Sequence, residues 1–211
     1  MVAQKRERKL PAERREEILA QAARIALSEG LERVTLRSVA EPLGVRPSLI
    51  NHYFPSVDAL IVSAFDSAMT RERARLFAGD GAPLDRLASF IARVENADGV
   101  ALTRLWLNAR NFARFNTQLA LSLAYQESLD RQLLVDLLNS GVEAGEFACA
   151  DTLAACIRIF VAIDGVGVYI NNPSDFSHPV FTNYISDVTA WAVETDAVEL
   201  RERVARAAAT Y

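Results

Sequence analysis

The stretch GVRPSLINHYF, residues 44–54, lies between prolines at positions 42 and 55 and contains a third proline at position 47. Proline suits the first position of a helix and disfavours helical geometry in the residue before it. The stretch therefore predicts a helix of about two turns that starts at Pro47 and stops before Pro55. Ile50 and Phe54 are four residues apart, so both can face a protein core. The polar residues left for the outer side are Arg46, Ser48, Asn51 and His52.

Two more helices are predicted before this stretch. Residues 11–29 begin with a proline, end before Gly30, and carry an apolar stripe at positions 18, 22, 25 and 26. Thr35 can cap a second helix, in which positions 36, 39, 40 and 43 are apolar at helical spacing. Pro42 is expected to end or bend that second helix near Glu41, and Gly44 then turns the chain.

Three helices within about fifty residues, the last two short and joined by a glycine turn, match the helix-turn-helix arrangement. A recognition helix needs a buried side that holds it and a polar side that faces base edges in the major groove. Arginine can pair with guanine and asparagine with adenine. The alternative is that residues 47–53 form only a short packing connector, with His52 as a packing residue.

The rest of the chain predicts longer helices, and no segment shows a convincing strand pattern. We expect an all-α protein of about nine helices, with a DNA-binding domain at residues 1–56 and a helical bundle at residues 57–211. Residues 153–170 are apolar nearly all round, so they must be covered on more than one side. They and the final helix, around residues 181–192, can complete a monomer core or pair across a homodimer.

The net charge of −4 is unevenly distributed. Residues 1–55 contain ten Lys or Arg against seven Asp or Glu, whereas residues 56–211 contain thirteen against twenty. A basic arm with Lys5, Arg6, Arg8 and Lys9 leads the chain and suggests an anionic partner, although short charged tails are often merely solvated. We see no export signal, because the amino terminus lacks an apolar segment of the secretory type. We also see no membrane span, because Arg158 and Asp164 interrupt the most apolar run. Together with only two cysteines, this predicts a cytoplasmic protein.

A small-molecule site is suggested by composition in the middle helices, where aromatic and polar residues lie close in sequence. Asp164, inside an apolar helix, is expected to face either an interface partner or a cavity, and with aromatics it would favour a cationic or amine ligand. The candidate ligand-binding residues are Trp106, Arg110, Phe112, Tyr125, Gln126, Phe160 and Asp164. Gly165 and Gly167 predict close helix approach rather than a dinucleotide site, and we expect no metal and no cofactor.

Residues 15–60 resemble the amino-terminal domain of the TetR family of one-component transcriptional regulators. The likeness lies in an Ile-Leu-x-x-Ala-Ala helix, the block GLERVTLRSVA, the pair Gly44-Val45, and Tyr53-Phe54 followed by Leu60. The segment DGVGVYINNP is similar to the BetI-like type of carboxy-terminal domain. The resemblance implies a homodimer that binds a roughly palindromic DNA operator, usually a repressor released by a small ligand.

The resemblance also implies roles for single residues. It places Arg46, Pro47, Ser48 and Leu49 at base-facing positions, and Asn51, His52 and Tyr53 where the family touches the groove edge and phosphates. Thr35 matches the start of a helix whose amides often meet a phosphate. Asn51 and Val57 stand where the family commonly has tyrosine and lysine, and the basic arm can compensate for the missing lysine.

Two other classes of function compete with this interpretation. A helical enzyme or a small-molecule-binding protein could use the same cavity without binding DNA, and a protein-interaction bundle could carry a degenerate helix-turn-helix. No nucleophile with a neighbouring base and no set of metal ligands can be assembled from nearby residues, which disfavours the enzyme. We therefore predict a ligand-responsive regulator of transcription and not an enzyme.

Overall fold

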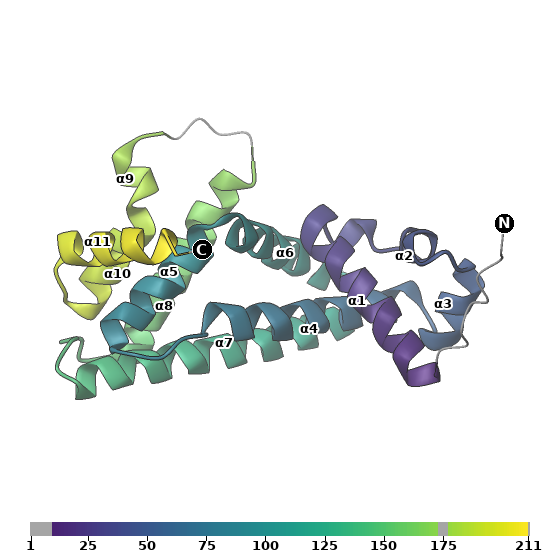
Figure 1. Cartoon of the computed structure of the whole chain (residues 1–211), viewed down its shortest axis with the longest axis horizontal. Coiled ribbons are helices and arrows are strands. Elements are labelled where there is room, and N and C mark those ends of the chain that lie inside the picture. The colour runs from purple at the N-terminus through teal and green to yellow at the C-terminus, as the bar shows by residue number, and fades with distance from the viewer. Residues whose placement is uncertain (1–9, 173–176, 211) are drawn as a thin grey trace. The chain divides into compact units, whose positions relative to one another are not determined.

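The computed structural model describes residues 10–172 and 177–210, and in these ranges the regular elements are all helices (Figure 1). The prediction of an all-α protein is confirmed. The elements are α1 (Pro11–Glu29), the 3₁₀ turn η1 (Leu31–Arg33), α2 (Leu36–Leu43), α3 (Pro47–Tyr53), α4 (Val57–Leu76), α5 (Pro83–Glu95), α6 (Ala97–Ala113), α7 (Thr117–Glu143), α8 (Thr152–Ile170), α9 (Pro179–Thr182), α10 (Tyr184–Val193) and α11 (Ala197–Ala208). The basic arm lies outside the described residues.

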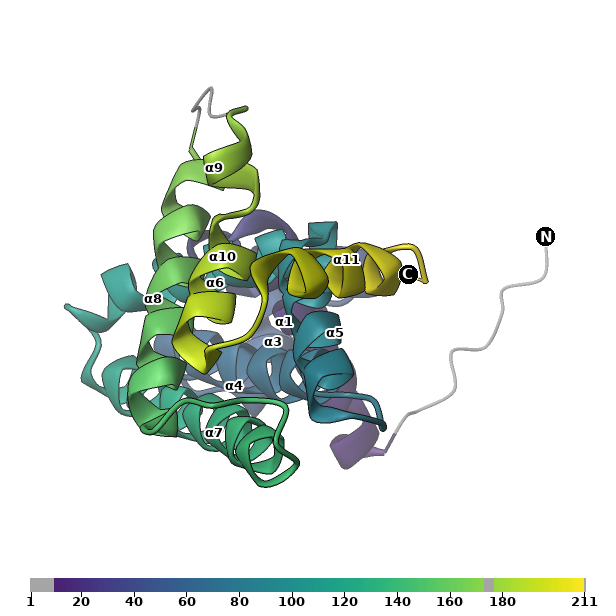
Figure 2. The same ribbon diagram turned by 90° about the vertical axis from the view of Figure 1, so that its left-hand side faces the viewer.

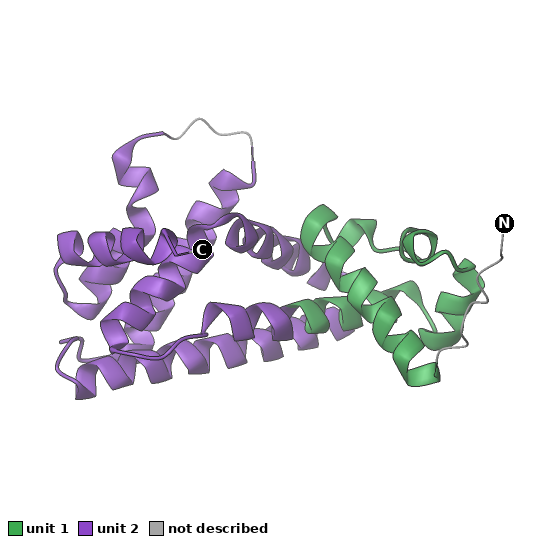
Figure 3. Ribbon diagram, viewed as in Figure 1, with its two compact units in different colours: residues 1–68 green, residues 69–211 purple. Residues whose placement is uncertain are grey.

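The chain forms two compact units, residues 1–68 and 69–211, shown in different colours in Figure 3. The division falls inside α4, twelve residues after the boundary expected from sequence at 56/57. One continuous helix thus begins in the first unit and ends in the second. The helix starts where Ser56 Oγ accepts a hydrogen bond from the amide of Ala59 (3.0 Å).

The first unit is built on the apolar stripe of α1. All four predicted stripe residues are buried, and α1 packs against α2, which in turn packs against α3. Thr35 caps α2 as expected: its Oγ1 accepts from the amide of Ser38 (3.0 Å), and Ser38 Oγ accepts from the amide of Thr35 (2.9 Å). These reciprocal bonds fix the first turn of α2.

The end of α2 differs from the expectation for Pro42. The helix continues through Pro42 to Leu43, two residues beyond Glu41, although Pro42 has no amide hydrogen to donate to the carbonyl of Ser38. Gly44 adopts a left-handed conformation (φ 61°, ψ 35°), its amide donates to the carbonyl of Glu41 (3.0 Å), and the amide of Val45 donates to that of Ala40 (3.1 Å). Gly44 is therefore the turn that separates α2 from α3, as predicted.

The second unit is a bundle in which α8 packs against α10, α6 and α7, while α5 packs against α11, α6 and α7. Figure 2 shows α8 and α10 side by side. At the α6–α8 crossing, a Cβ atom on Gly167 would lie 2.0 Å from Thr103 Cγ2, so glycine is needed there. Gly165 has open space instead, and only Gly167 serves the predicted close approach.

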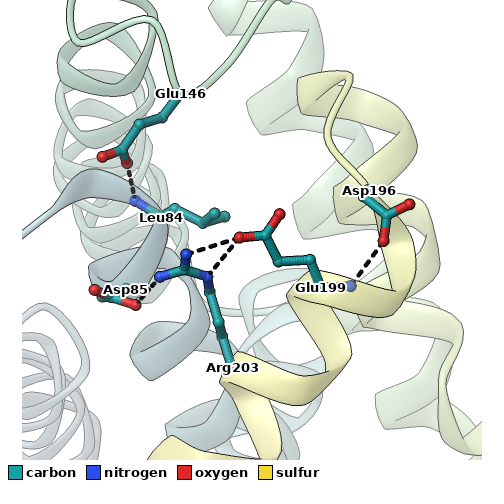
Figure 4. A network of polar contacts seen from close by, with 6 residues as sticks. All are labelled: Leu84, Asp85, Glu146, Asp196, Glu199 and Arg203. Carbon is teal, nitrogen blue, oxygen red and sulfur yellow. Dashed lines mark hydrogen bonds and ion pairs between the residues drawn. The ribbon is translucent and has the colours of Figure 1, made fainter.

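The carboxy-terminal region contains more helices than the nine expected for the chain. The single final helix predicted around residues 181–192 is divided into α9 and α10, and α11 follows. Helix α11 docks on α5 through polar contacts as well as through buried Leu200 and Val204. Arg203 bridges Asp85 at the start of α5 and Glu199 in its own helix, as drawn in Figure 4. The apolar residues Leu200 and Val204, four positions apart after the capping residue Asp196, were an available signal for this helix.

By length and composition alone, helix α8 is long and apolar enough to cross a membrane. About a third of its most apolar stretch is buried within the protein. Its inner side packs on three neighbouring helices, and Asp164 in its middle is ion-paired with Arg110. Both features suit a helix of a bundle core. The absence of a membrane span stays a prediction from the sequence.

Candidate DNA-binding helix and ligand cavity

Helix α3 is a two-turn element with one buried and one exposed side. Arg46 precedes it in extended geometry (φ −81°, ψ 144°), Pro47 is its first residue, and Phe54 returns to extended geometry after its last. Ile50 is fully buried and Phe54 is 2% exposed, so these two side chains hold the helix in the unit. The guanidinium of Arg15 lies over the Phe54 ring, 5.0 Å from its centre.

The residues expected to contact DNA lie mostly on the open side of this unit. Arg46, Pro47, Ser48, Asn51, His52 and Thr35 are exposed, whereas Leu49 and Tyr53 are half-buried. Residues of the turn and of α3 line an open surface hollow, and they are Gly44, Val45, Arg46, Ser48, Leu49 and His52. The geometry offers an exposed polar helix face, and major-groove binding requires such a face because the groove admits an α-helix.

The hydroxyl of Thr35 is used within the protein, since it caps α2. Any phosphate at this end of α2 would meet amides and the exposed Arg37 of the first turn rather than a free threonine hydroxyl. Arg37 was not among the residues expected from the sequence to contact DNA. Its place as the second residue of α2 was the signal in the sequence that it could contact a phosphate at this helix end.

The second unit contains a cavity of about 230 Å³ between the end of α4 and helices α5 to α8. Most of its wall is apolar. The lining residues are Leu76, Phe77, Phe90, Val94, Gly99, Leu102, Thr103, Trp106, Arg110, Glu127, Asp130, Arg131, Ile157, Phe160, Val161, Ile163 and Asp164. An apolar cavity with a few polar groups is the usual form of a small-molecule site.

Four of the seven residues suggested as ligand contacts lie together in this lining: Trp106, Arg110, Phe160 and Asp164. The other three, Phe112, Tyr125 and Gln126, are not in it. Tyr125 is 61% exposed, and Gln126 is buried, where its Oε1 accepts a hydrogen bond from Arg73 Nη2 (2.6 Å). Helical spacing alone could not tell which side of α7 faces the cavity.

Of the two places expected for Asp164, the single chain shows the cavity: Asp164 lines it and pairs with Arg110. Arg110 Nη2 lies 3.0 Å from Asp164 Oδ2 and 3.1 Å from Glu127 Oε1, so one guanidinium serves two carboxylates. The same guanidinium lies 5.4 Å from the centre of the Trp106 ring. Burial raises the pKa of Asp164 above its usual value, and Arg110 opposes this effect.

A second ion pair joins α4 to α7 beside the cavity. Arg73 Nε donates to Asp130 Oδ1, and its Nη2 donates to the side chain and carbonyl of Gln126. Only 12% of the Arg73 side chain and 13% of the Asp130 side chain are exposed. Burial raises the pKa of Asp130, while the Arg73 guanidinium acts to lower it. Nothing in the sequence signals this contact between residues 57 positions apart.

The described residues contain no cluster of metal ligands and no exposed thiol. Within residues 10–172 and 177–210, no three His, Cys, Asp or Glu side chains are grouped so that they could hold a metal ion. Both cysteines are free and buried, and burial raises the pKa of Cys156 to about 11. At neutral pH Cys156 is therefore a protonated thiol and a poor nucleophile.

The two units together define a class of protein in which a helix-turn-helix domain is joined to a helical bundle with a ligand-sized cavity. Residues 18–64 match the family model described as bacterial regulatory proteins, tetR family. The match covers most of α1, the whole of α2 and α3, and the first two turns of α4, so the helix-turn-helix region of the chain is similar to that of bacterial regulatory proteins.

Solved structures share the fold over most of the chain. A TetR-family transcriptional regulator from Cytophaga hutchinsonii is 16% identical, with a TM-score of 0.72 over 89% of this chain and 97% of that one. A putative transcriptional regulator from Saccharomonospora viridis in complex with choline is 18% identical (TM-score 0.67; 83% and 95% covered). FadR from Bacillus subtilis in complex with stearoyl-CoA is 19% identical (TM-score 0.62; 86% and 98%). None of the curated proteins matches the chain in sequence.

Proposed function

We propose that this protein is a cytoplasmic, homodimeric repressor that binds a palindromic DNA operator and is released from it by a small molecule. The observation that carries the proposal is the exposed polar side of α3, held in place by Ile50 and Phe54. Arg46, Ser48 and Asn51 have the hydrogen-bonding groups that read base edges. His52 and Tyr53, whose rings meet edge to face at 5.3 Å, are assigned to the groove edge and backbone.

The homodimer is proposed to form through α8 and α10, the two helices predicted last from the sequence. Both carry large apolar side chains on the surface of the single chain. On α8 these include Ile157, Val161 and Val168, and on α10 they include Tyr184 and Trp191. Exposed apolar side chains concentrated on adjacent helices are characteristic of an interaction surface. A second copy of the chain would cover these side chains, and the resulting dimer would contain two α3 helices.

Helix α4 is the proposed carrier of the ligand signal. Its last turn supplies Leu76 to the cavity wall, Phe77 follows directly, and Arg73 ties the helix to Asp130, another wall residue. A ligand in this cavity therefore touches the end of α4. The start of α4 follows α3 directly in the chain. The signal requires that the ligand bind the free and operator-bound forms with different affinity. Solved relatives in fold hold choline and stearoyl-CoA, which supports a small-molecule effector without choosing its charge.

Selection from a pool of random duplexes tests the proposal with no assumption about the operator sequence. We expect an enriched inverted repeat, because a symmetric dimer presents its recognition helix twice. Failure to enrich any sequence at low salt, or enrichment of single half-sites only, would contradict the dimeric regulator. Equal affinity of an effector for the free and operator-bound protein would contradict the release mechanism.

Arg46→Ala is expected to weaken binding to the selected operator by about 1 to 3 kcal/mol and to relax preference at one base pair. The exposed Arg46 stands at the start of α3, where its side chain can reach a guanine. Fluorescence anisotropy with a panel of single-base operator variants measures both effects. Arg24→Ala, an exposed arginine on α1, is the matched control. An unchanged base preference in Arg46→Ala would remove this residue from the base-reading set.

Neutralising Lys5, Arg6, Arg8 and Lys9 together is expected to weaken binding to all duplexes alike. Each lost phosphate contact should flatten the slope of log K against log salt by about 0.9. The measurement is a salt titration with the operator and with an unrelated duplex. If the variant kept the slope of the parent protein, the arm would be an ordinary solvated tail.

A further inference from the structure

We propose that the effector of the cavity is an organic cation with an apolar body, whose charge faces Asp164 and Glu127. The inference rests on the proposed function, because it names the class of ligand for the same cavity. It comes from the charges of the wall and from the aromatic side chains beside them.

The charges of the wall are unequally satisfied. Asp130 has a dedicated partner in Arg73. Asp164 and Glu127 instead share one guanidinium, that of Arg110, at 3.0 and 3.1 Å. Arg110, Asp164 and Glu127 together carry one net negative charge when both carboxylates are ionised. A ligand that covers them removes water from this surplus charge, and a positive group on the ligand offsets that cost.

The aromatic side chains suit the same ligand. Trp106 already lies 5.4 Å from the guanidinium of Arg110, so its ring faces a region that accepts positive charge. Phe160, Phe77 and Phe90 line the cavity with it and provide apolar surface for the body of the ligand. Charge and apolar surface thus lie within one cavity of about 230 Å³.

An anionic ligand fits these contacts less well. It would compete with Glu127 and Asp164 for Arg110 and would bring a third negative charge beside these two carboxylates. The other lining arginine, Arg131, is exposed, so water already solvates it and it adds little attraction. A neutral ligand fits the apolar wall but leaves the surplus negative charge uncompensated. The wall therefore favours a cation over both.

Three probes of matched size test the inference on the full-length protein: benzyltrimethylammonium, its uncharged isostere 2,2-dimethylpropylbenzene, and 3-phenylpropanoate. Binding is followed by protein fluorescence, because Trp106 lines the cavity. We expect the cation to bind about tenfold more tightly than the neutral isostere, a ratio equivalent to one modest charge contact. The anion should bind more weakly than either.

Asp164→Asn removes the surplus charge while keeping the shape of the side chain. We expect it to weaken cation binding about tenfold and to leave binding of the neutral probe within about twofold. Glu127→Gln should act in the same direction and serves as a second variant if the first folds poorly, which a thermal melt reports. Asp136→Asn is the matched control, since Asp136 is an exposed carboxylate of α7 outside the cavity lining.

Several outcomes would overturn the cation assignment: tighter binding of the neutral or anionic probe, binding of none of the three, or full cation affinity in both variants. The first of these would leave the proposal of a ligand-responsive regulator standing. Loss of that proposal would show instead as failure to enrich a duplex sequence, whatever the probes do. The two failures are therefore distinguishable.

Discussion

Arg73→Met is expected to lower the free energy of unfolding by about 3 kcal/mol, because it strands the buried carboxylate of Asp130. Both side chains of this pair are nearly nine-tenths buried, so solvent screens the interaction little. The guanidinium also donates to the carbonyl and side-chain oxygens of Gln126, which lose a donor in the variant. Urea unfolding of the parent and variant proteins measures the difference.

The loss of stability should depend on pH. Burial already raises the pKa of Asp130, and the variant removes the group that lowers it, so this pKa rises further. The destabilisation is fully present above the folded-state pKa of Asp130. It is relieved as the pH falls through that value toward the ordinary pKa of aspartate, because the protonated carboxyl needs no cation. The difference between parent and variant should therefore shrink in acid.

Arg71→Met provides the control on the same helix, since Arg71 is exposed, and its effect should stay within about 0.5 kcal/mol. Replacing both members of the pair, Arg73→Met with Asp130→Leu, should recover most of the lost stability. A single variant as stable as the parent at neutral pH would show that the pair does not hold α4. The role proposed for α4 in the ligand response would then lose its main support.

The DNA-binding unit was largely predictable because its determinants are local. Gly44, Pro47 and Pro55 act on the backbone of their own neighbourhood, and the structure places α3 between them as expected. Thr35 likewise caps the next residues of the chain. The end of α2 was predicted less closely: the helix was expected to end or bend near Glu41, and it ends two residues later at Leu43.

The cavity was only partly predictable because its determinants are distant in sequence. Composition suggested Trp106 and Asp164, but the side of α7 that faces inward depends on how five helices pack. That packing turns Glu127 and Asp130 to the cavity and Tyr125 to the surface. The pairing of Arg73 with Asp130 has no local signal at all, and it appears only in the folded bundle.

Phe54→Ala is expected to destabilise the DNA-binding unit by about 3 to 5 kcal/mol and to abolish operator binding at ordinary temperatures. Phe54 is among the largest fully buried side chains and follows α3 directly. With Ile50 it is one of the two apolar side chains that hold a helix too short to be stable alone. The alanine variant should lose the exposed polar face as an ordered surface, although no DNA-contacting residue has changed.

Phe115→Ala makes the same chemical change at a side chain that is 85% exposed, and it should leave stability within about 0.5 kcal/mol and operator binding intact. Phe54→Leu keeps most of the buried volume and should retain part of the affinity. Circular dichroism melts and anisotropy titrations with the selected operator report both quantities. Full operator affinity in Phe54→Ala would mean that DNA itself orders α3, and that the buried side of this helix is not what positions it for recognition.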